Sequence, residues 1–158
     1  MCMILKELYQ KVFHEQFDFS DLDKRIKLQK AVYLLENMGL NIGDYSFSWA
    51  KYGPYSLRLD GDAQACMLRD LQQVDFSDFA INRFKKLSEY LQESYVPYNE
   101  RKWIESIASI HFLQNACHLS TQNALDVLMK RKEYLNNVSL NQRAAKIADT
   151  INSLGIIN

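Results

Sequence analysis

Apolar side chains recur at helical spacing through most of this 158-residue chain. Near the amino end they stand at i, i+3, i+4, i+7 and i+8, the spacing that places side chains on one stripe of a helix. This first stripe consists of Leu5, Leu8, Tyr9, Val12 and Phe13. It predicts a helix that ends near Gln16.

Similar patterns predict further helices, each introduced by a residue that can cap it. A helix is expected to start near Ser56, with Leu57, Leu59, Ala63, Cys66, Met67 and Leu71 on its buried side. The remaining predicted helices follow the caps Ser20, Ser77, Asn99, Ser120 and Ser139, the last being a capping box with Gln142. Gly155 is expected to close the final helix.

The segment from Leu22 to about residue 38 carries too many apolar residues for one stripe. Leu22, Ile26 and Tyr33 form one row, and Leu28, Val32 and Leu35 form another. A helix with two apolar rows packs on two sides. We therefore expect this helix to lie near the centre of the domain.

A single clear strand is expected after Gly43 and Asp44. Gly53 and Pro54 should end or reverse it, because proline cannot donate a hydrogen bond to a sheet. The strand pattern is the alternation of Tyr45, Phe47 and Trp49 with Ser46, Ser48 and Ala50. Together with the helices, it predicts a mainly α, single compact domain over residues 1–158, with about six to seven helices and a small β-hairpin or strand pair.

Charge and composition restrict the classes of function that the chain can have. Nineteen basic residues balance nineteen acidic ones, so net charge supplies no long-range attraction to nucleic acid or to an anionic membrane. The longest wholly apolar run, Ala31 to Leu35, is far too short to span a membrane. Three widely spaced cysteines lack a C-x-x-C pair, and we expect free thiols in a cytoplasmic protein.

No group of residues in the sequence indicates a catalytic reaction. His111, Cys117 and His118 are close in sequence, but no nearby acid completes a set of three or four metal ligands. Nothing marks any of the thiols as an activated nucleophile. We therefore expect no metal, no cofactor and no catalytic residue.

Two short motifs carry a family resemblance. Lys27-Leu28-Gln29-Lys30 opens the central predicted helix, and Trp49-Ala50-Lys51-Tyr52-Gly53-Pro54 forms a W-x-x-Y-G-P turn that leads into another helix. This combination resembles the Panacea or SocA-like antitoxin domains. The Tyr52–Ser56 version of the turn and the later apolar helix from Trp103 to Leu113 resemble the YwgA-like branch of that family.

The resemblance implies a mostly helical domain without a catalytic centre. Characterised relatives act as antitoxins or as adaptors that deliver a toxin to a protease. The expected activity is therefore binding of a protein partner, such as a toxin or a protease, by an antitoxin-like neutraliser or a proteolytic adaptor.

The expected binding surface surrounds the aromatic turn. For two lysines of the central helix, a solvated helix edge competes with a basic rim beside the turn, and Gln29 could instead point inward and satisfy backbone groups. The aromatic residues are expected to be about half buried, with exposed edges that serve as binding hot spots. The candidate partner-binding residues are Lys27, Lys30, Trp49, Lys51, Tyr52, Tyr55 and Arg58.

A winged-helix-like nucleic-acid-binding regulator is the alternative. Helices followed by a strand and an aromatic turn resemble that arrangement, and Lys24, Arg25, Lys27 and Lys30 could contact phosphates. Phosphate contacts normally come from a net positive surface. Residues 1–60 and residues 61–158 each carry equal numbers of basic and acidic residues, which disfavours the alternative.

Overall fold

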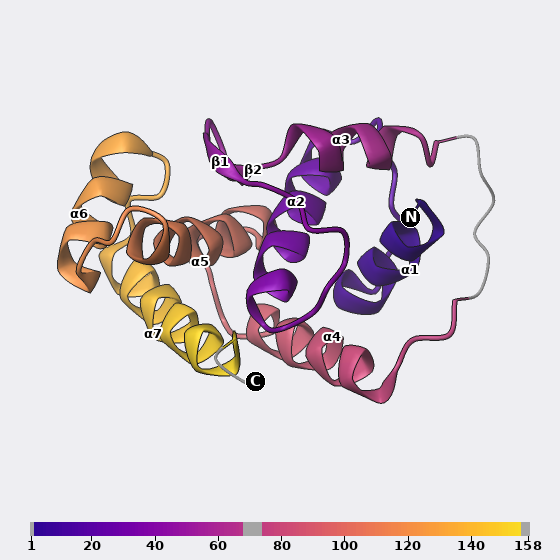
Figure 1. The fold of residues 1–158 in the computed structure, drawn as a ribbon. Coiled ribbons are helices and arrows are strands. Elements are labelled where there is room, and N and C mark those ends of the chain that lie inside the picture. Colours follow the sequence, from indigo (N-terminus) through magenta and orange to yellow (C-terminus); the bar gives the residue numbers. More distant parts are fainter. Residues whose placement is uncertain (1, 68–73, 156–158) are drawn as a thin grey trace.

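The structure, a computed structural model, describes residues 2–67 and 74–155 of the chain. Seven helices and a two-stranded hairpin lie within these residues (Figure 1). The mainly helical compact domain with a hairpin that the sequence predicts is confirmed. The elements are α1 Cys2–Phe13, α2 Leu22–Asn37, β1 Ser48–Ala50, β2 Gly53–Tyr55, α3 Leu57–Gln64, α4 Asp78–Leu91, α5 Glu100–Asn115, α6 Thr121–Arg131 and α7 Val138–Gly155.

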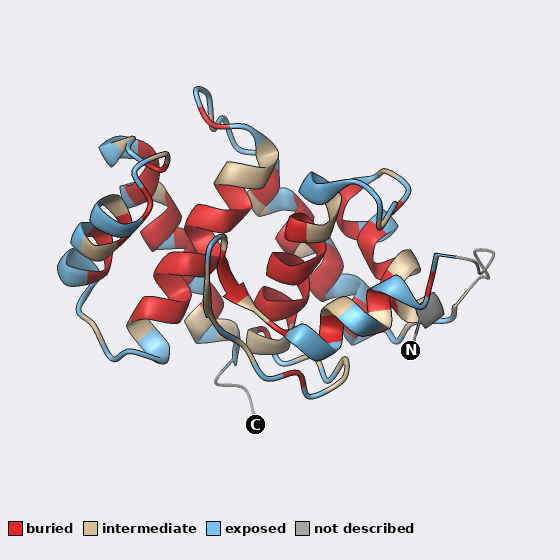
Figure 2. Cartoon of the chain, turned by 90° about the horizontal axis from the view of Figure 1, so that it is seen from above, coloured by how far each residue is buried: buried red, intermediate tan, exposed pale blue. Residues whose placement is uncertain are grey.

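Two helices, α2 and α5, form the centre of the core. Every residue from Ile26 to Leu35 in α2 and from Trp103 to Leu113 in α5 is buried. In Figure 1, α2 stands between α1 and α4 on one side and α5, α6 and α7 on the other, and Figure 2 shows the buried residues concentrated in these middle helices. The prediction that the second helix packs on two sides is confirmed.

The hairpin follows α2 in the chain and packs against both central helices. Its strands pair antiparallel, with Trp49 opposite Pro54 and Ala50 opposite Gly53. The paired strand begins at Ser48 and not at Tyr45 as the alternation predicts. Tyr45 is nevertheless buried and Phe47 packs on the core, so the apolar side chains are used although the ladder does not extend to them.

The caps show which local signals decide helix ends. Ser77, Asn99 and Ser120 cap α4, α5 and α6 as predicted, each accepting a hydrogen bond from a backbone amide in the first turn. For α2 the cap is Asp21 and not Ser20. At α7 the expected capping box at Ser139 is wrong, because the Asn137 side chain accepts from the Leu140 amide and the helix begins earlier.

The buried side of α3 is partly wrong as predicted. Leu59 and Ala63 are buried, but Leu57 is 77% exposed and Met67 is 52% exposed. Leu71 lies outside the described residues. This helix covers the core with few residues because it is short and lies at the surface (Figure 1).

The cysteines differ from one another. Cys66 is disulfide-bonded, so the expectation of free thiols is wrong at this position, whereas Cys117 is free and exposed. The side chain of Cys2 lies outside the described part of the chain. No helix within the described ranges has both the length and the apolar character needed to cross a membrane.

Candidate interaction site at the hairpin

A paired hydrogen bond joins α2 to the end of the hairpin. The Gln29 side-chain amide donates from Nε2 to the Ser56 carbonyl at 2.9 Å, and its Oε1 accepts from the Ser56 backbone amide at 2.9 Å. Both residues are buried. The alternative in which Gln29 points inward and satisfies backbone groups is therefore the one that the structure adopts, since a primary amide can donate and accept at once.

Lys30 holds the second strand from beneath. Its ammonium donates to the Pro54 carbonyl at 2.8 Å, and the side chain is only 1% exposed. Burial lowers the pKa of Lys30 to about 7, with the nearby Glu105 carboxylate opposing the shift and the Lys132 charge adding to it. The amine is thus a buried donor for the hairpin backbone.

The connection between α6 and α7 holds the turn of the hairpin. Lys132 donates to the carbonyls of Ala50, at 3.1 Å, and of Lys51. The Tyr134 hydroxyl lies 3.1 Å from the same Lys51 carbonyl and donates to Glu105. Side chains from two distant parts of the chain, α2 and the α6–α7 connection, therefore satisfy hairpin carbonyls.

Buried charges surround these contacts. Lys132 Nζ lies 3.8 Å from Glu105 Oε2, and both side chains are almost fully buried. Burial lowers the pKa of Lys132 while the Glu105 charge opposes it. Burial likewise raises the pKa of Glu105, against the hydrogen bond from Tyr134 and the charge of Lys132.

A glycine allows the hairpin to approach α5. Gly53 has φ +96°, a conformation that side chains rarely adopt, and a Cβ at this position would lie 2.5 Å from Ser109 Oγ. An isolated two-stranded hairpin is marginally stable in water. Here the close packing at Gly53 and the side-chain donors from α2 and the α6–α7 connection hold it in place.

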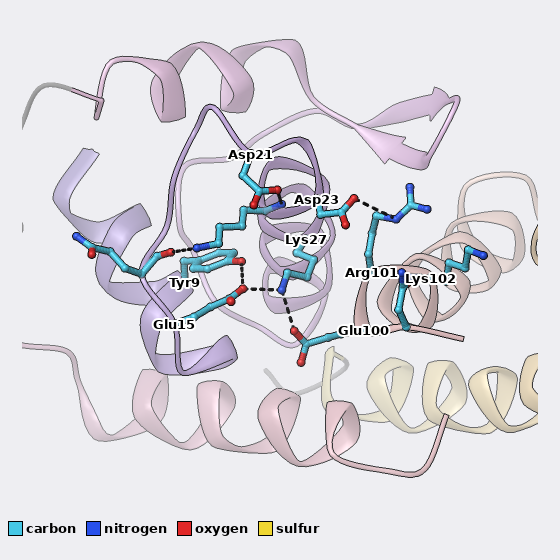
Figure 3. A network of polar contacts seen from close by, with 11 residues as sticks. Tyr9, Glu15, Asp21, Asp23, Lys27, Glu100, Arg101 and Lys102 are labelled. Atoms are coloured by element: carbon cyan, nitrogen blue, oxygen red, sulfur yellow. Dashed lines mark hydrogen bonds and ion pairs between the residues drawn. The ribbon is translucent and has the colours of Figure 1, made fainter. Parts of the chain in front are cut away.

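Lys27 lies apart from the hairpin, in a polar network that joins α1, α2 and α5 (Figure 3). Its ammonium contacts Glu15 Oε1 at 2.6 Å and Glu100 Oε1 at 2.8 Å, and the Tyr9 hydroxyl donates to Glu15 at 2.6 Å. Burial alone would lower the pKa of Lys27, but the hydrogen bonds to both carboxylates outweigh burial and raise the pKa. Lys27 therefore acts as a structural cation.

These positions correct the expected basic surface. Lys27 is 8% exposed and Lys30 is 1% exposed, so the solvated edge and the basic rim expected for them are both absent. Each ammonium already contacts a partner within the protein. The lysines of the Lys-Leu-Gln-Lys motif support the hairpin and the helix packing from the inside.

A pocket of about 230 Å³ lies between the first half of α2 and the hairpin. Ile26, Gln29 and Lys30 are its buried residues, and Leu22 and Lys51 are its exposed ones. We call it the hairpin pocket. It is lined by Leu22, Arg25, Ile26, Gln29, Lys30, Ala50, Lys51, Tyr52, Tyr55 and Asp60.

Two partly exposed tyrosines form the aromatic part of the hairpin pocket. The Tyr52 ring has the Lys51 ammonium 5.3 Å and the Arg101 guanidinium 5.4 Å from its centroid. The Tyr55 hydroxyl donates to Asp60 Oδ2 at 3.2 Å. Lys51, Tyr52 and Tyr55 are thus the predicted site residues that the structure brings together beside Lys30.

Trp49 and Arg58 lie elsewhere. Trp49 packs on Phe112, with ring centroids 5.9 Å apart, and does not line the hairpin pocket. The Arg58 guanidinium donates to the Gly43 carbonyl and lies 4.6 Å from the Tyr45 ring. Because successive helical residues are turned by about 100°, Arg58 and Asp60 point to nearly opposite sides of α3.

Sequence reasoning missed several residues of the hairpin pocket: Leu22, Arg25, Ile26, Ala50 and Asp60. A usable signal was present in α2. Leu22, Ile26 and Lys30 are four residues apart, as are Arg25 and Gln29, and such residues share a helix face. Asp60 carried no comparable signal, because only the packing of α3 brings it near Arg25.

The histidines do not form a metal centre with their neighbours. His111 is buried, and its Nδ1 lies 2.7 Å from the Tyr33 hydroxyl, whereas His118 is exposed. Within residues 2–67 and 74–155, no three His, Cys, Asp or Glu side chains gather closely enough to hold a metal ion. Burial lowers the pKa of His111 to about 4, which favours the neutral ring.

Neither protein-family models, nor curated proteins, nor solved structures gave a match to this chain. The resemblance to Panacea and YwgA-like domains therefore stays an expectation from the sequence.

Proposed function

We propose that this chain is a non-catalytic protein-interaction module, an antitoxin-like neutraliser or proteolytic adaptor of the Panacea and YwgA-like kind, that binds a protein partner at the hairpin pocket. The observation that carries the proposal is the hairpin pocket itself. It combines a buried floor with partly exposed Tyr52, Tyr55 and Arg25, and tyrosine and arginine are enriched among the residues that dominate binding energy at protein interfaces.

The size of the hairpin pocket supports a side chain as its occupant. Its volume of about 230 Å³ lies below the roughly 300–1,000 Å³ typical of sites for small molecules and cofactors. A buried anchor side chain from a partner needs less space. The hairpin is also held by buried hydrogen bonds, so little ordering is required when a partner binds.

Lys30 is the residue that most invites a catalytic interpretation. A lysine with a pKa near neutrality can serve as a base or a nucleophile. However, the Lys30 amine is almost completely buried and donates to the Pro54 carbonyl. We therefore assign it to holding the strand, which supports binding without catalysis.

Most of the basic residues that the nucleic-acid-binding alternative relies on are buried or already paired within the protein. Lys27 and Lys30 are buried, and Lys24 donates to the Gln16 carbonyl at 2.7 Å. Arg25 is the remaining cation of that group, and Asp60 lies beside it. This helix therefore offers few available cations for the phosphate contacts that dominate nucleic-acid affinity.

Affinity capture with the 158-residue chain tests the proposal. The wild type is compared with Ala50→Trp, which places an indole in the hairpin pocket, and with Tyr52→Ala, which removes part of its wall. Leu57→Ala and Arg58→Ala are matched surface controls, since neither residue lines the hairpin pocket. A captured protein is then purified, and its binding to each variant is measured directly.

If the proposal is correct, a partner binds the wild type and both control variants. It fails to bind the two pocket variants, although the thermal midpoints of these variants are unchanged. Co-expression then separates the two roles: a neutraliser relieves growth arrest caused by the partner, whereas an adaptor shortens the lifetime of the partner. A partner that binds all variants equally would overturn the assignment to the hairpin pocket. Turnover of a small molecule by the purified chain would overturn the non-catalytic role.

A further inference from the structure

The floor of the hairpin pocket offers mainly apolar contact. Its polar side chains are already engaged: Gln29 pairs with the Ser56 backbone, and the Lys30 ammonium donates to the Pro54 carbonyl. What remains for an entering group is the surface of Ile26 and Ala50 together with the tyrosine rings. A polar anchor would lose its hydration there without gaining partners, so the entering side chain is apolar.

The accessible charge beside this apolar floor is mainly positive. Arg25 and Lys51 are the accessible cations that line the hairpin pocket, and Asp60 is its single carboxylate. Arg25 Nε lies 3.8 Å from Asp60 Oδ1, which is beyond hydrogen-bonding distance. Nε is also buried without a hydrogen-bond partner among the described residues.

Asp60 is partly engaged elsewhere, because its Oδ2 accepts from the Tyr55 hydroxyl. The guanidinium of Arg25 therefore keeps donor capacity for a further carboxylate, whose geometry matches its planar fork.

A third cation stands at the edge. The guanidinium of Arg101, at the start of α5, lies 5.4 Å from the centroid of the Tyr52 ring. Its Nε lies 3.5 Å from Asp23 Oδ1 (Figure 3). A partner with a basic residue beside its anchor would meet Arg25 and Lys51, and such like-charge contacts oppose binding. Arg101 adds little to this repulsion because it is paired with Asp23. An acidic neighbour would meet cations instead.

We infer that the hairpin pocket receives an acidic peptide segment, in which an apolar side chain enters the pocket and a neighbouring carboxylate pairs with Arg25 and Lys51. This inference rests on the proposed function and names the chemistry of the partner. The apolar anchor supplies the buried area and the carboxylate supplies the selectivity.

Selection of a phage-displayed library of random short peptides on the wild-type 158-residue chain tests this inference. Enriched peptides are expected to carry Asp or Glu next to a large apolar residue and to lose binding to Ala50→Trp and Tyr52→Ala. The best peptide is then synthesised with its acid and with the matching amide, Asn or Gln. Both are titrated by fluorescence anisotropy at low and high salt.

The amide peptide should bind the wild type about tenfold more weakly, as expected for loss of a charge-assisted hydrogen bond. Arg25→Gln should weaken the acidic peptide by a similar factor while leaving the amide peptide almost unaffected. Lys51→Gln, at an exposed position, repeats this comparison without disturbing the Asp60 pair. Arg131→Gln, an exposed arginine on α6, is the control and should change neither affinity.

The outcomes separate the two claims. Neutral or basic peptides that still require Tyr52 would overturn the acidic segment and leave the proposed function standing. Failure to select any peptide that depends on the hairpin pocket would count against both. Binding of a single-stranded oligonucleotide with the same dependence on Arg25 and Lys51 would overturn the inference in favour of a phosphate ligand.

Discussion

Gln29 and Ser56 pair as two amides do in a sheet: the side chain of one donates to and accepts from the backbone of the other, at 2.9 Å in both directions. Through this pair, the central helix α2 replaces a neighbouring strand at the end of the hairpin and leaves no buried backbone group of Ser56 unsatisfied. Ser56 is also the cap of α3, accepting from the Leu59 amide at 3.2 Å. One residue thus ends the hairpin and starts the next helix.

The first prediction concerns this pair. Gln29→Leu keeps a side chain of similar size but leaves the Ser56 amide buried without a partner, while the Ser56 carbonyl keeps only its hydrogen bond from the Asp60 amide, at 3.1 Å. Loss of both hydrogen bonds should lower the free energy of unfolding by about 2–4 kcal/mol. For a chain of this size, the thermal midpoint should then fall by at least about 4 °C. Gln64→Leu, at an exposed position of α3, should change the midpoint little, and an equal fall in both variants would contradict the role of the pair.

The second prediction concerns the approach of the hairpin to α5. Gly53→Ala should destabilise the protein. The strain of alanine at this φ costs about 1–3 kcal/mol, and the contact of its Cβ with Ser109 Oγ adds to this cost. Ser109→Ala alone should be nearly neutral, since Ser109 Oγ has no hydrogen-bond partner among the described residues.

Urea unfolding of the two single variants and the double variant measures the coupling. Ser109→Ala should restore part of the stability of Gly53→Ala by removing the clash, while the backbone strain remains. Strict additivity would show that Ser109 is not what limits this approach.

The third prediction is a pH dependence carried by Lys30. Its pKa falls from an ordinary value of 10.5 to about 7 in the folded protein, so between these values the unfolded chain binds the additional proton. The free energy of unfolding therefore rises as pH rises through this window, and below it the penalty of burying the charge is fully present.

Urea unfolding of the wild type and of Lys30→Met, at about pH 7 and at about pH 10, tests this. The wild type should gain stability relative to Lys30→Met as the pH rises. Lys130→Met, at an exposed lysine of α6, controls for the loss of one positive charge. Parallel changes in the wild type and Lys30→Met would show that Lys30 remains protonated throughout the window.

The fourth prediction concerns Lys27. Lys27→Met should lower the free energy of unfolding by about 1–3 kcal/mol, because Glu15 and Glu100 lose the cation between them. Both carboxylates are partly exposed, so water limits the cost. Changing Glu15 and Glu100 to Gln in the Lys27→Met background should recover part of the loss. If Lys102→Met on α5 costs as much as Lys27→Met, the effect is not specific to the network.

Local patterns were sufficient for the elements of the fold. The two apolar rows of the second helix predicted that α2 is buried on two sides, and the caps Ser77, Asn99 and Ser120 located three helix starts, because caps and periodicity depend on residues near one another in the chain. Errors arose where a local signal had a competitor. Asp21 caps α2 in place of Ser20, and Leu57 at the start of α3 points to solvent.

The binding surface was harder to predict, because the same residue types serve a surface or an interior according to what packs around them. Nothing near Lys27 or Lys30 in the sequence reveals Glu15, Glu100 or the Pro54 carbonyl, which are 12, 73 and 24 residues away. A lysine is usually exposed unless a partner meets it, and those partners arrive only when α1, α5 and the hairpin close around α2.

By itself, the sequence determined a mainly helical domain with a central second helix and an aromatic hairpin turn, and it left the direction of Gln29 open. The tertiary structure alone decided which of the motif residues remain accessible. It buries both lysines of the motif, turns Trp49 and Arg58 away, and brings Arg25 and Asp60 beside Lys51, Tyr52 and Tyr55. The physical reason is that burial and charge pairing depend on contacts between distant segments, whereas periodicity and capping do not.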